Sequence, residues 1–520
     1  MEETKSSDDQ GAPQIDVVVL PQCDDYAPIH RLPPEILNLI FVACQDAVAL
    51  PARHKWSNTR SIHRWVRVIQ VCHYWREVGL NTPRLWTDIY MSGTDSPQRI
   101  RTFLERSQQA PLTITIRDCS SIQQETLCAV IAEIARAERV DIEMSCSDFE
   151  RIEGINCWPS IAPLLRSLKT RDVSRIKAVP DTYRVFFAKV LAPSLEHLDT
   201  DCSLVDWMPG AAPVSLTTLL VANSQSPYAV TSVESVIEFL ARLPHLERLE
   251  LVDALEPIPA QAVSAPPHKK VALPRMRRLC LTEPTTSCAR LLGSLDLPVS
   301  QIPQITMKLD MCSMDYTSLM AAVPILSALV QDISPNVIII QEHPGNAKFD
   351  LTVYDLPDDP DADPVTVPFI RMAGTTSVRN FRVAPVGTPP LAPSLCYNLL
   401  ARLPLELVTS CSLHTNAPPD DPIWDGIARA LPAVEHLVTP AFPVPTELQI
   451  VVTALGACGD SVTPKYRMAN ATKLTLYNIR FRDRSCEVGA KTKLQELLDL
   501  LLCRREAGCP PIQKVWLGRA

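Results

Sequence analysis

Glycine is scarce in this sequence, with 15 glycines among 520 residues against 47 prolines. Few positions therefore use the positive φ angles that glycine tolerates, and many segments begin or end at a proline. The glycine-rich phosphate loops G-x-x-x-x-G-K-[S/T] and G-x-G-x-x-G do not occur, nor do H-E-x-x-H and G-x-S-x-G. We therefore predict no catalytic residue, no cofactor and no enzymatic activity of the common kinds.

Long apolar runs and clustered cysteines are missing too. No stretch of 18 apolar residues exists, so no membrane span is predicted, and the acidic start MEETKSSDDQ does not resemble a secretory signal. The 17 cysteines are spread from Cys23 to Cys509 without a C-x-x-C pair. This spread indicates reduced thiols in a cytoplasmic or nuclear protein rather than a disulfide scaffold or a zinc site. The net charge of −8 argues against a nucleic-acid binder.

Three isolated features could suggest chemistry, and each is interpreted otherwise. The acidic run from Asp358 to Asp363 lacks the glycine and glutamate of a calcium loop, so no metal is predicted there. Cys72 lies on an apolar stripe and is interpreted as a core thiol. The histidines that precede strand leucines are interpreted as solvated: His197, His245 and His436.

The chain begins with a polar stretch, residues 1–28, that we expect to be a disordered tail. Residues 29–90 are aromatic and apolar, and hold four of the eight tryptophans, which predicts a compact core or a contact surface. LPPEILNLIF, from Leu32 to Phe41, predicts a helix that begins at a proline pair. WVRVIQVCHYWREV predicts a second helix with Cys72 and Trp75 on its apolar stripe, and Pro83 ends it. A polar insertion is expected between the two, over residues 43–61.

Basic residues gather in this region. Between Arg53 and Arg84 there are seven lysines and arginines and one acid, Glu77. This excess fits either an acidic partner or a solvated helix face.

Residues 98–520 alternate amphipathic helices with short strands. TSVESVIEFLARLPHLERLELVD shows the unit most clearly: Thr231 and Glu234 have the spacing of a capping box, and Leu249 and Leu251 predict a strand. The same register returns in LPRMRRLCL and LPAVEHLVT, and more weakly in APSLEHLDT, SLTTLLV and NATKLTLYN. Leu249 and Leu279 are 30 residues apart, which accommodates a helix and a strand, and such units must stack to bury their apolar faces.

This spacing resembles irregular leucine-rich repeats, which implies an α/β solenoid over residues 98–520. The alternative is an ordinary α/β domain with leucine-rich helices. Concave faces of such arrays are lined by residues that flank the strand leucines. The candidate target-binding residues are therefore Arg248, Glu250, Arg278 and Cys280.

Residues 32–86 resemble an F-box. Three short matches occur in order: the opening LPPEILNLIF, then VCHYWR from Val71 to Arg76, then Leu85-Trp86. The insertion after the first helix and the degenerate leucine-rich remainder are similar to large F-box families of mushroom-forming fungi. The expected fold class is thus α+β, an all-helical F-box followed by the repeat region.

The resemblance implies a substrate receptor of a Skp–cullin–F-box ubiquitin ligase. Such a receptor binds the Skp adaptor, and through it a cullin, while another face binds an unknown protein substrate; it works by proximity rather than by covalent catalysis. The motif positions that would form the module core or the adaptor-binding face are Leu32, Pro33, Pro34, Ile36, Leu37, Ile40, Phe41, Val71, Cys72, Trp75 and Trp86. No nucleic acid and no membrane are expected as partners.

Three other functions stay open at this point. The chain could be a leucine-rich interaction scaffold with no ubiquitin-ligase role. It could be a hydrolase or transferase whose polar residues converge in a pocket that sequence does not reveal. Salt-dependent binding of the basic segment, residues 53–84, to DNA or RNA would indicate a nucleic-acid binder.

Overall fold

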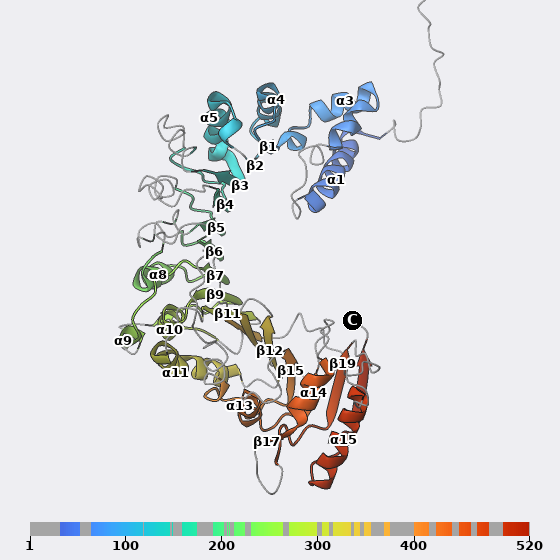
Figure 1. Ribbon diagram of the computed structural model, residues 1–520. Coiled ribbons are helices and arrows are strands. Elements are labelled where there is room, and N and C mark those ends of the chain that lie inside the picture. The colour runs from blue at the N-terminus through green and yellow to red at the C-terminus, as the bar shows by residue number, and fades with distance from the viewer. Residues whose placement is uncertain are drawn as a thin grey trace, which may run out of the picture. The chain divides into compact units, whose positions relative to one another are not determined.

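The computed structural model divides the chain into two compact units (Figure 1). The first consists of Met1–Thr87 with Thr102–Ala110, and the second of Asp88–Arg101 with Pro111–Ala520. The residues that the structure describes are 32–52, 64–117, 119–145, 148, 159–173, 191–201, 205, 207, 213–223, 230–263, 270–298, 304–310, 316–333, 337–343, 348–354, 369–374, 400–414, 423–438, 447–458, 465–477 and 492–518. The expected tail, residues 1–28, and the acidic run from Asp358 to Asp363 lie outside them.

The first unit is helical. It contains α1 (Pro34–Ala52), the 3-10 helix η2 (Arg64–Gln70), α3 (His73–Leu80) and the 3-10 helix η3 (Pro83–Trp86). The predicted start of α1 is confirmed, because the amides of Ile36 and Leu37 both donate to the carbonyl of Pro33. The helix runs past the predicted end, since VACQDAVALPA is rich in good helix formers. The expected insertion at residues 43–61 is therefore helical up to Ala52, and the rest of it lies outside the described residues.

The second predicted helix is broken in two. Cys72 has an extended backbone, φ −152° and ψ 173°, and acts as the N-cap of α3, its Sγ accepting from the Trp75 amide at 3.5 Å. Val71, on the expected apolar stripe, is 59% exposed. The prediction of a single helix was wrong, because the side chain of Cys72 caps the start of α3 and so competes with continuation of the preceding helix.

Strands dominate the second unit, and sixteen described strands form one sheet. They are β1 (Asp88–Met91), β2 (Leu112–Ile116), β3 (Ala137–Met144), β4 (Ser167–Asp172), β5 (His197–Asp201), β6 (Thr218–Ala222), β7 (Arg248–Val252), β9 (Arg278–Pro284), β11 (Gln304–Asp310), β12 (Val337–His343), β13 (Lys348–Tyr354), β14 (Phe369–Gly374), β15 (Ser410–His414), β16 (His436–Val438), β19 (Lys473–Tyr477) and β20 (Lys514–Gly518). From β1 to β11 each strand of this sheet pairs in parallel with the strand of the same sheet that follows it in sequence. The predicted mixture of helices and strands behind a helical N-terminal region is confirmed.

One backbone arrangement repeats along this sheet. The carbonyl of the residue just before a strand accepts from two successive amides of the following unit. Thr217 accepts from Glu247 and Arg248, at 2.8 and 2.9 Å, and Glu247 accepts from Arg277 and Arg278, at 2.7 and 2.9 Å. The same pair of bonds joins Arg166 to 196–197, Glu196 to 217–218, Thr409 to 435–436 and Glu435 to 472–473. Each unit is therefore held to its neighbour in the same way.

The strand leucines stack in register. Leu198, Leu219, Leu249 and Leu279 are direct partners on successive strands, and all are buried. The predicted strand with Leu249 and Leu251 is confirmed as β7. Although 37 residues separate Leu437 from Leu474, they too are direct partners, because the extra length lies between the strands.

The regular order is interrupted after β11. The next strands in the sheet are β14, β13 and β12, joined by antiparallel pairs, and parallel pairing resumes from β12 to β15. Leucine spacing contains no sign of this reversal. Helices of the second unit are α5 (Gln124–Ala132), α8 (Val233–Leu240), α9 (Ala260–Val263), α10 (Thr285–Gly293), α11 (Tyr316–Ile333), α13 (Ile423–Ala430), α14 (Glu447–Leu455) and α15 (Lys493–Glu506), and α4 (Pro97–Ser107) is divided between the units.

The capping box predicted before α8 was wrong by one residue. Ser232 is the N-cap, and its hydroxyl accepts from the Ser235 amide at 3.1 Å. Thr231 instead forms a parallel bridge with Leu255. The bridge fixes Thr231 in an extended conformation, so the helix begins after the next residue.

Candidate functional site

Aromatic side chains build the core of the first unit. Trp86, 4% exposed, meets Trp65 edge to face with ring centroids 5.2 Å apart, and Phe103 with centroids 5.0 Å apart. The guanidinium of Arg106 lies 4.5 Å from the Trp86 ring centroid. These contacts make Trp86 the centre of the core, since such aromatic and cation–π pairs stabilise beyond their buried area.

Close backbone approach completes this core. The indole Nε1 of Trp86 donates to the carbonyl of Gly79 at 3.0 Å. A Cβ on Gly79 would lie 2.2 Å from Cγ2 of Ile69, so α3 and η2 pack closely only because this residue is glycine. The Tyr74 hydroxyl donates to the Leu32 carbonyl at 2.9 Å and ties α3 to the residues that precede α1.

The α1 residues named by the motif divide between core and surface. Leu37 is fully buried, and Phe41, 1% exposed, contacts Trp75 with ring centroids 5.3 Å apart. Ile36 is 43% exposed, and Leu39, which the motif reading did not select, is 64% exposed. Residues three apart lie on one helix face, so Ile36 and Leu39 form an exposed apolar surface on α1. The apolar stripe expected over the first helix is therefore only partly core.

The remaining motif residues have mixed exposure. Pro33, Pro34 and Val71 are exposed, while Leu32, Ile40, Cys72 and Trp75 are half-buried. The interpretation of Cys72 as a core thiol was wrong, because its sulfur caps α3. The spacing of Ile36 and Leu39 is the signal that would have added Leu39 to the candidate surface.

Exposed basic side chains also belong to this unit. In the described part of the predicted basic segment, residues 64–84, Arg67, Arg76 and Arg84 are exposed, with one exposed acid, Glu77. Glu77 lies 3.9 Å from the exposed His73. The described part of the predicted basic segment therefore presents its cations to solvent.

The four candidate target-binding residues lie side by side on the sheet. Arg248 is the register partner of Arg278, and Glu250 is the register partner of Cys280, across strands β7 and β9. All four are half-buried. One ion pair joins two of them, Arg248 Nη2 to Glu250 Oε2 at 3.0 Å. The structure thus brings these four predicted residues together.

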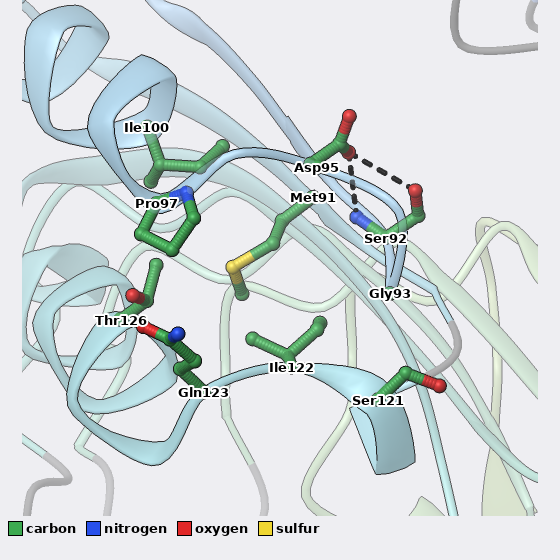
Figure 2. Close-up of a pocket in the computed structure, with 10 residues that line it drawn as sticks. All are labelled: Met91, Ser92, Gly93, Asp95, Pro97, Ile100, Ser121, Ile122, Gln123 and Thr126. Atoms are coloured by element: carbon green, nitrogen blue, oxygen red, sulfur yellow. Dashed lines mark hydrogen bonds between the residues drawn. The ribbon is translucent and has the colours of Figure 1, made fainter.

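A small cavity of about 140 Å³ lies at the carboxyl end of β1 (Figure 2). Its walls include the buried side chains of Met91, Ile100 and Ile122. Asp95, its one acidic lining residue, accepts from the Ser92 amide and hydroxyl, at 2.8 and 3.0 Å, and pairs with Arg99 at 2.8 Å. The acid is thus held in a turn, and the lining shows no nucleophile–base pair of the kind that catalysis uses.

His436 is not simply solvated, contrary to the prediction. Its Nε2 lies 2.8 Å from the Thr475 hydroxyl and its Nδ1 3.4 Å from that of Ser410, so it links three neighbouring strands. Burial, with a smaller contribution from the charge of Lys473, lowers the pKa of His436. This histidine therefore has a structural place in the sheet, while His197 and His245 are exposed.

Within the described ranges, no cluster of three or more His, Cys, Asp or Glu side chains could hold a metal ion. In the same ranges, no helix is long and apolar enough to span a bilayer.

Comparison with known proteins identifies one part of the chain. Residues 29–92 match the family model described as F-box-like. A search of curated proteins finds no match. Among solved structures, the chain is similar to the crystal structure of the Rad7 and Elc1 complex in yeast, at 10% identity and a TM-score of 0.26, over 78% of this chain and 88% of that one. The chain therefore carries an F-box-like domain over residues 29–92.

Proposed function

We propose that the chain is a substrate receptor of a Skp–cullin–F-box ubiquitin ligase. The observation that carries the proposal is the exposed apolar surface of Ile36 and Leu39 on α1, inside the region that matches the F-box-like family. Large apolar side chains exposed together on a folded helix indicate a contact with another protein. The adaptor docks on this surface, with Pro33 and Val71 as further candidate contacts.

Charge supports the same partner. The exposed guanidinium groups of Arg67, Arg76 and Arg84 accelerate association with an acidic surface and favour it over a basic one. An acidic Skp-type adaptor has the required sign. The cullin joins through the adaptor and makes no contact that this chain must supply.

In this proposal the target protein binds to the strand array, which is the sixteen-stranded sheet from β1 to β20 in the second unit. We infer that the repeated backbone bonds and the stacked leucines belong to a leucine-rich-repeat-like solenoid over residues 98–520. Holding adaptor and target on one chain raises the effective concentration of target lysines at the ubiquitin-conjugating enzyme. The receptor is non-catalytic, acts in the cytoplasm or nucleus, and belongs with the large fungal F-box families.

Co-purification of the full chain with the organism's Skp adaptor tests the proposal. We expect wild type to retain the adaptor in a 1:1 ratio, and Ile36→Asp and Leu39→Asp to lose it, since each places a charge in the contact. Leu407→Asp is the control matched to Leu39→Asp, because Leu407 is 66% exposed against 64% for Leu39, but it lies in the second unit, before β15. Loss of the adaptor by the Leu407→Asp control, or retention of the adaptor by both α1 variants, would contradict the assigned surface. Adaptor binding without any cullin-dependent target would favour the non-catalytic interaction scaffold.

A further inference from the structure

Seven serine or threonine residues of this chain directly precede a proline, and one of them also has a cation nearby in the sequence. Ser96 alone among the seven is followed by a lysine or arginine three residues later, in Ser96-Pro97-Gln98-Arg99. Proline-directed kinases require a proline directly after the hydroxyl that they modify, and those of the cyclin-dependent class favour a cation three residues after it. The sequence around Ser96 therefore has the pattern of an acceptor for such a kinase.

The structure separates the two of these seven positions that it describes, Thr82 and Ser96. Thr82 is 5% exposed, and its hydroxyl donates to the carbonyl of Val78 at 2.8 Å. Ser96 is exposed and directly precedes α4. An enzyme can therefore reach the hydroxyl of Ser96, whereas that of Thr82 is covered.

The backbone after Ser96 can open at a small cost. A residue that precedes proline is biased toward an extended conformation, which is the conformation in which kinases bind their acceptor segments. The carbonyl of Ser96 accepts from the amides of Arg99 and Ile100, at 3.0 and 3.3 Å. Because the first amides of a helix have no acceptor within the helix, unwinding the first turn of α4 breaks few backbone hydrogen bonds.

The cation at the fourth position of this sequence is held by an acid beside Ser96. Arg99 Nη2 lies 2.8 Å from Asp95 Oδ1 and donates to the carbonyl of Tyr90 at 3.0 Å. A phosphate on Ser96 carries about two negative charges at neutral pH and, three residues before Arg99, lies on the same side of the helix. The phosphate therefore gives Arg99 a second anionic partner and competes with Asp95 for it.

We propose that Ser96 is a phosphorylation site of a proline-directed kinase and that the phosphate strengthens the start of α4. The γ-phosphoryl group of ATP passes to Ser96 Oγ, the hydroxyl proton passes to a base of the kinase, and ADP leaves. Negative charge at the start of a helix is favourable, and the pair with Arg99 adds to it. Since α4 is divided between the two units, the modification acts on a segment to which both contribute. The site does not depend on the proposed receptor function.

Phosphorylation of the full-length protein in vitro tests the site. The protein is incubated with a recombinant cyclin-dependent kinase and magnesium ATP, and the rate at each modified residue is measured by peptide mass spectrometry. We expect Ser96 to be modified fastest and Thr82 to stay unmodified. Modification of other residues while Ser96 stays unmodified would overturn the proposal.

Variants of the two nearby arginines test the role of the cation. Arg99→Gln should slow modification of Ser96 about tenfold, and Arg99→Lys should stay close to wild type because it keeps the charge. Arg101→Gln is the matched control, since it removes the same charge from an exposed residue two positions later, and it should keep the wild-type rate. Equal rates in Arg99→Gln and Arg101→Gln would overturn the assignment to a kinase that selects the cation.

Hydrogen exchange of the modified protein tests the effect on the helix. We expect the amides of residues 98–101 to exchange about threefold more slowly after phosphorylation, because the added charge stabilises the first turn. The amides of α15, in another part of the chain, should be unchanged. Equal or faster exchange over residues 98–101 would overturn the proposed strengthening of α4.

Discussion

The F-box-like module, which is the first unit of the chain, and the strand array of the second unit bury apolar side chains in different patterns. In the module, Trp65, Trp86 and Phe103 meet around one centre, and Gly79 brings two helical segments into contact. In the array, one leucine per strand repeats along the sheet, and each contacts its neighbours in register. A single centre couples all of its parts, whereas a stack couples only adjacent units.

The two regions also differ in how they can be recognised from the sequence and in which of their positions can bind a partner. The module has specific residues at fixed positions, which a family model detects over residues 29–92. In the array the recurrent feature is the spacing of the leucines, and the residues between them differ from unit to unit. A destabilising substitution should therefore weaken the whole module, whereas in the array it should weaken only the neighbouring strands.

Trp86→Ala should have the largest effect. It removes a side chain that contacts Trp65, Phe103 and Arg106 and donates to Gly79, and large-to-small changes of this kind cost about 3–5 kcal/mol. Hydrogen-exchange mass spectrometry of the full chain should show lost protection throughout residues 32–86. Loss restricted to the segment around residue 86 would contradict a single coupled core.

Leu249→Ala should have a smaller and more local effect. Leu249 is fully buried between register partners Leu219 and Leu279, and its truncation is expected to cost about 2–3 kcal/mol. Hydrogen exchange should increase on β6, β7 and β9 while β19 and β20 keep their protection. A uniform increase over the whole array would show that it unfolds as one unit and would contradict nearest-neighbour stacking.

The array also contains a buried acid whose ionisation should oppose folding. Glu283, 1% exposed, accepts from the amides of Ala254 and Leu255, at 2.9 and 2.8 Å. Burial outweighs these hydrogen bonds and raises the pKa of Glu283 from 4.5 to about 8. Because the folded-state pKa is the higher one, the folded form binds more protons, and stability decreases as the pH rises from the unfolded to the folded pKa.

Between pH 6 and pH 9 this loss should amount to about 2 kcal/mol. Thermal unfolding monitored across that range should show a smaller decrease for Glu283→Gln, which cannot ionise. The difference between the two pH profiles isolates the contribution of Glu283 from other titrating groups. Identical pH profiles would contradict a raised pKa.

The sequence predicted elements best where one local signal determined them. The proline pair before Ile36 marks the start of α1, and the leucines of β7 stack as their spacing requires. The errors arose where two local signals compete. Cys72 could continue a helix or cap one, and its local bond to the Trp75 amide decided for the cap. Thr231 could cap α8 or join a bridge, and its pairing with Leu255 decided for the bridge.

The candidate sites were predictable to different degrees. Motif positions identify the module, but only side-chain exposure separates buried Leu37 from exposed Ile36 and adds Leu39. Sequence spacing placed Arg248 and Arg278 near strand leucines, yet their registry depends on the pairing of β7 with β9. The reversal consists of two antiparallel pairs, β12 with β13 and β13 with β14, for which leucine spacing gives no signal.

Hydrogen exchange of the full chain with and without the purified Skp adaptor tests the central claim most directly. We predict that the adaptor slows exchange in the module, with the strongest protection on α1 around Ile36 and Leu39, and leaves β2 to β20 unchanged. Protection confined to the strand array, or none at an adaptor concentration that saturates another F-box protein, would contradict the division of roles between the two regions.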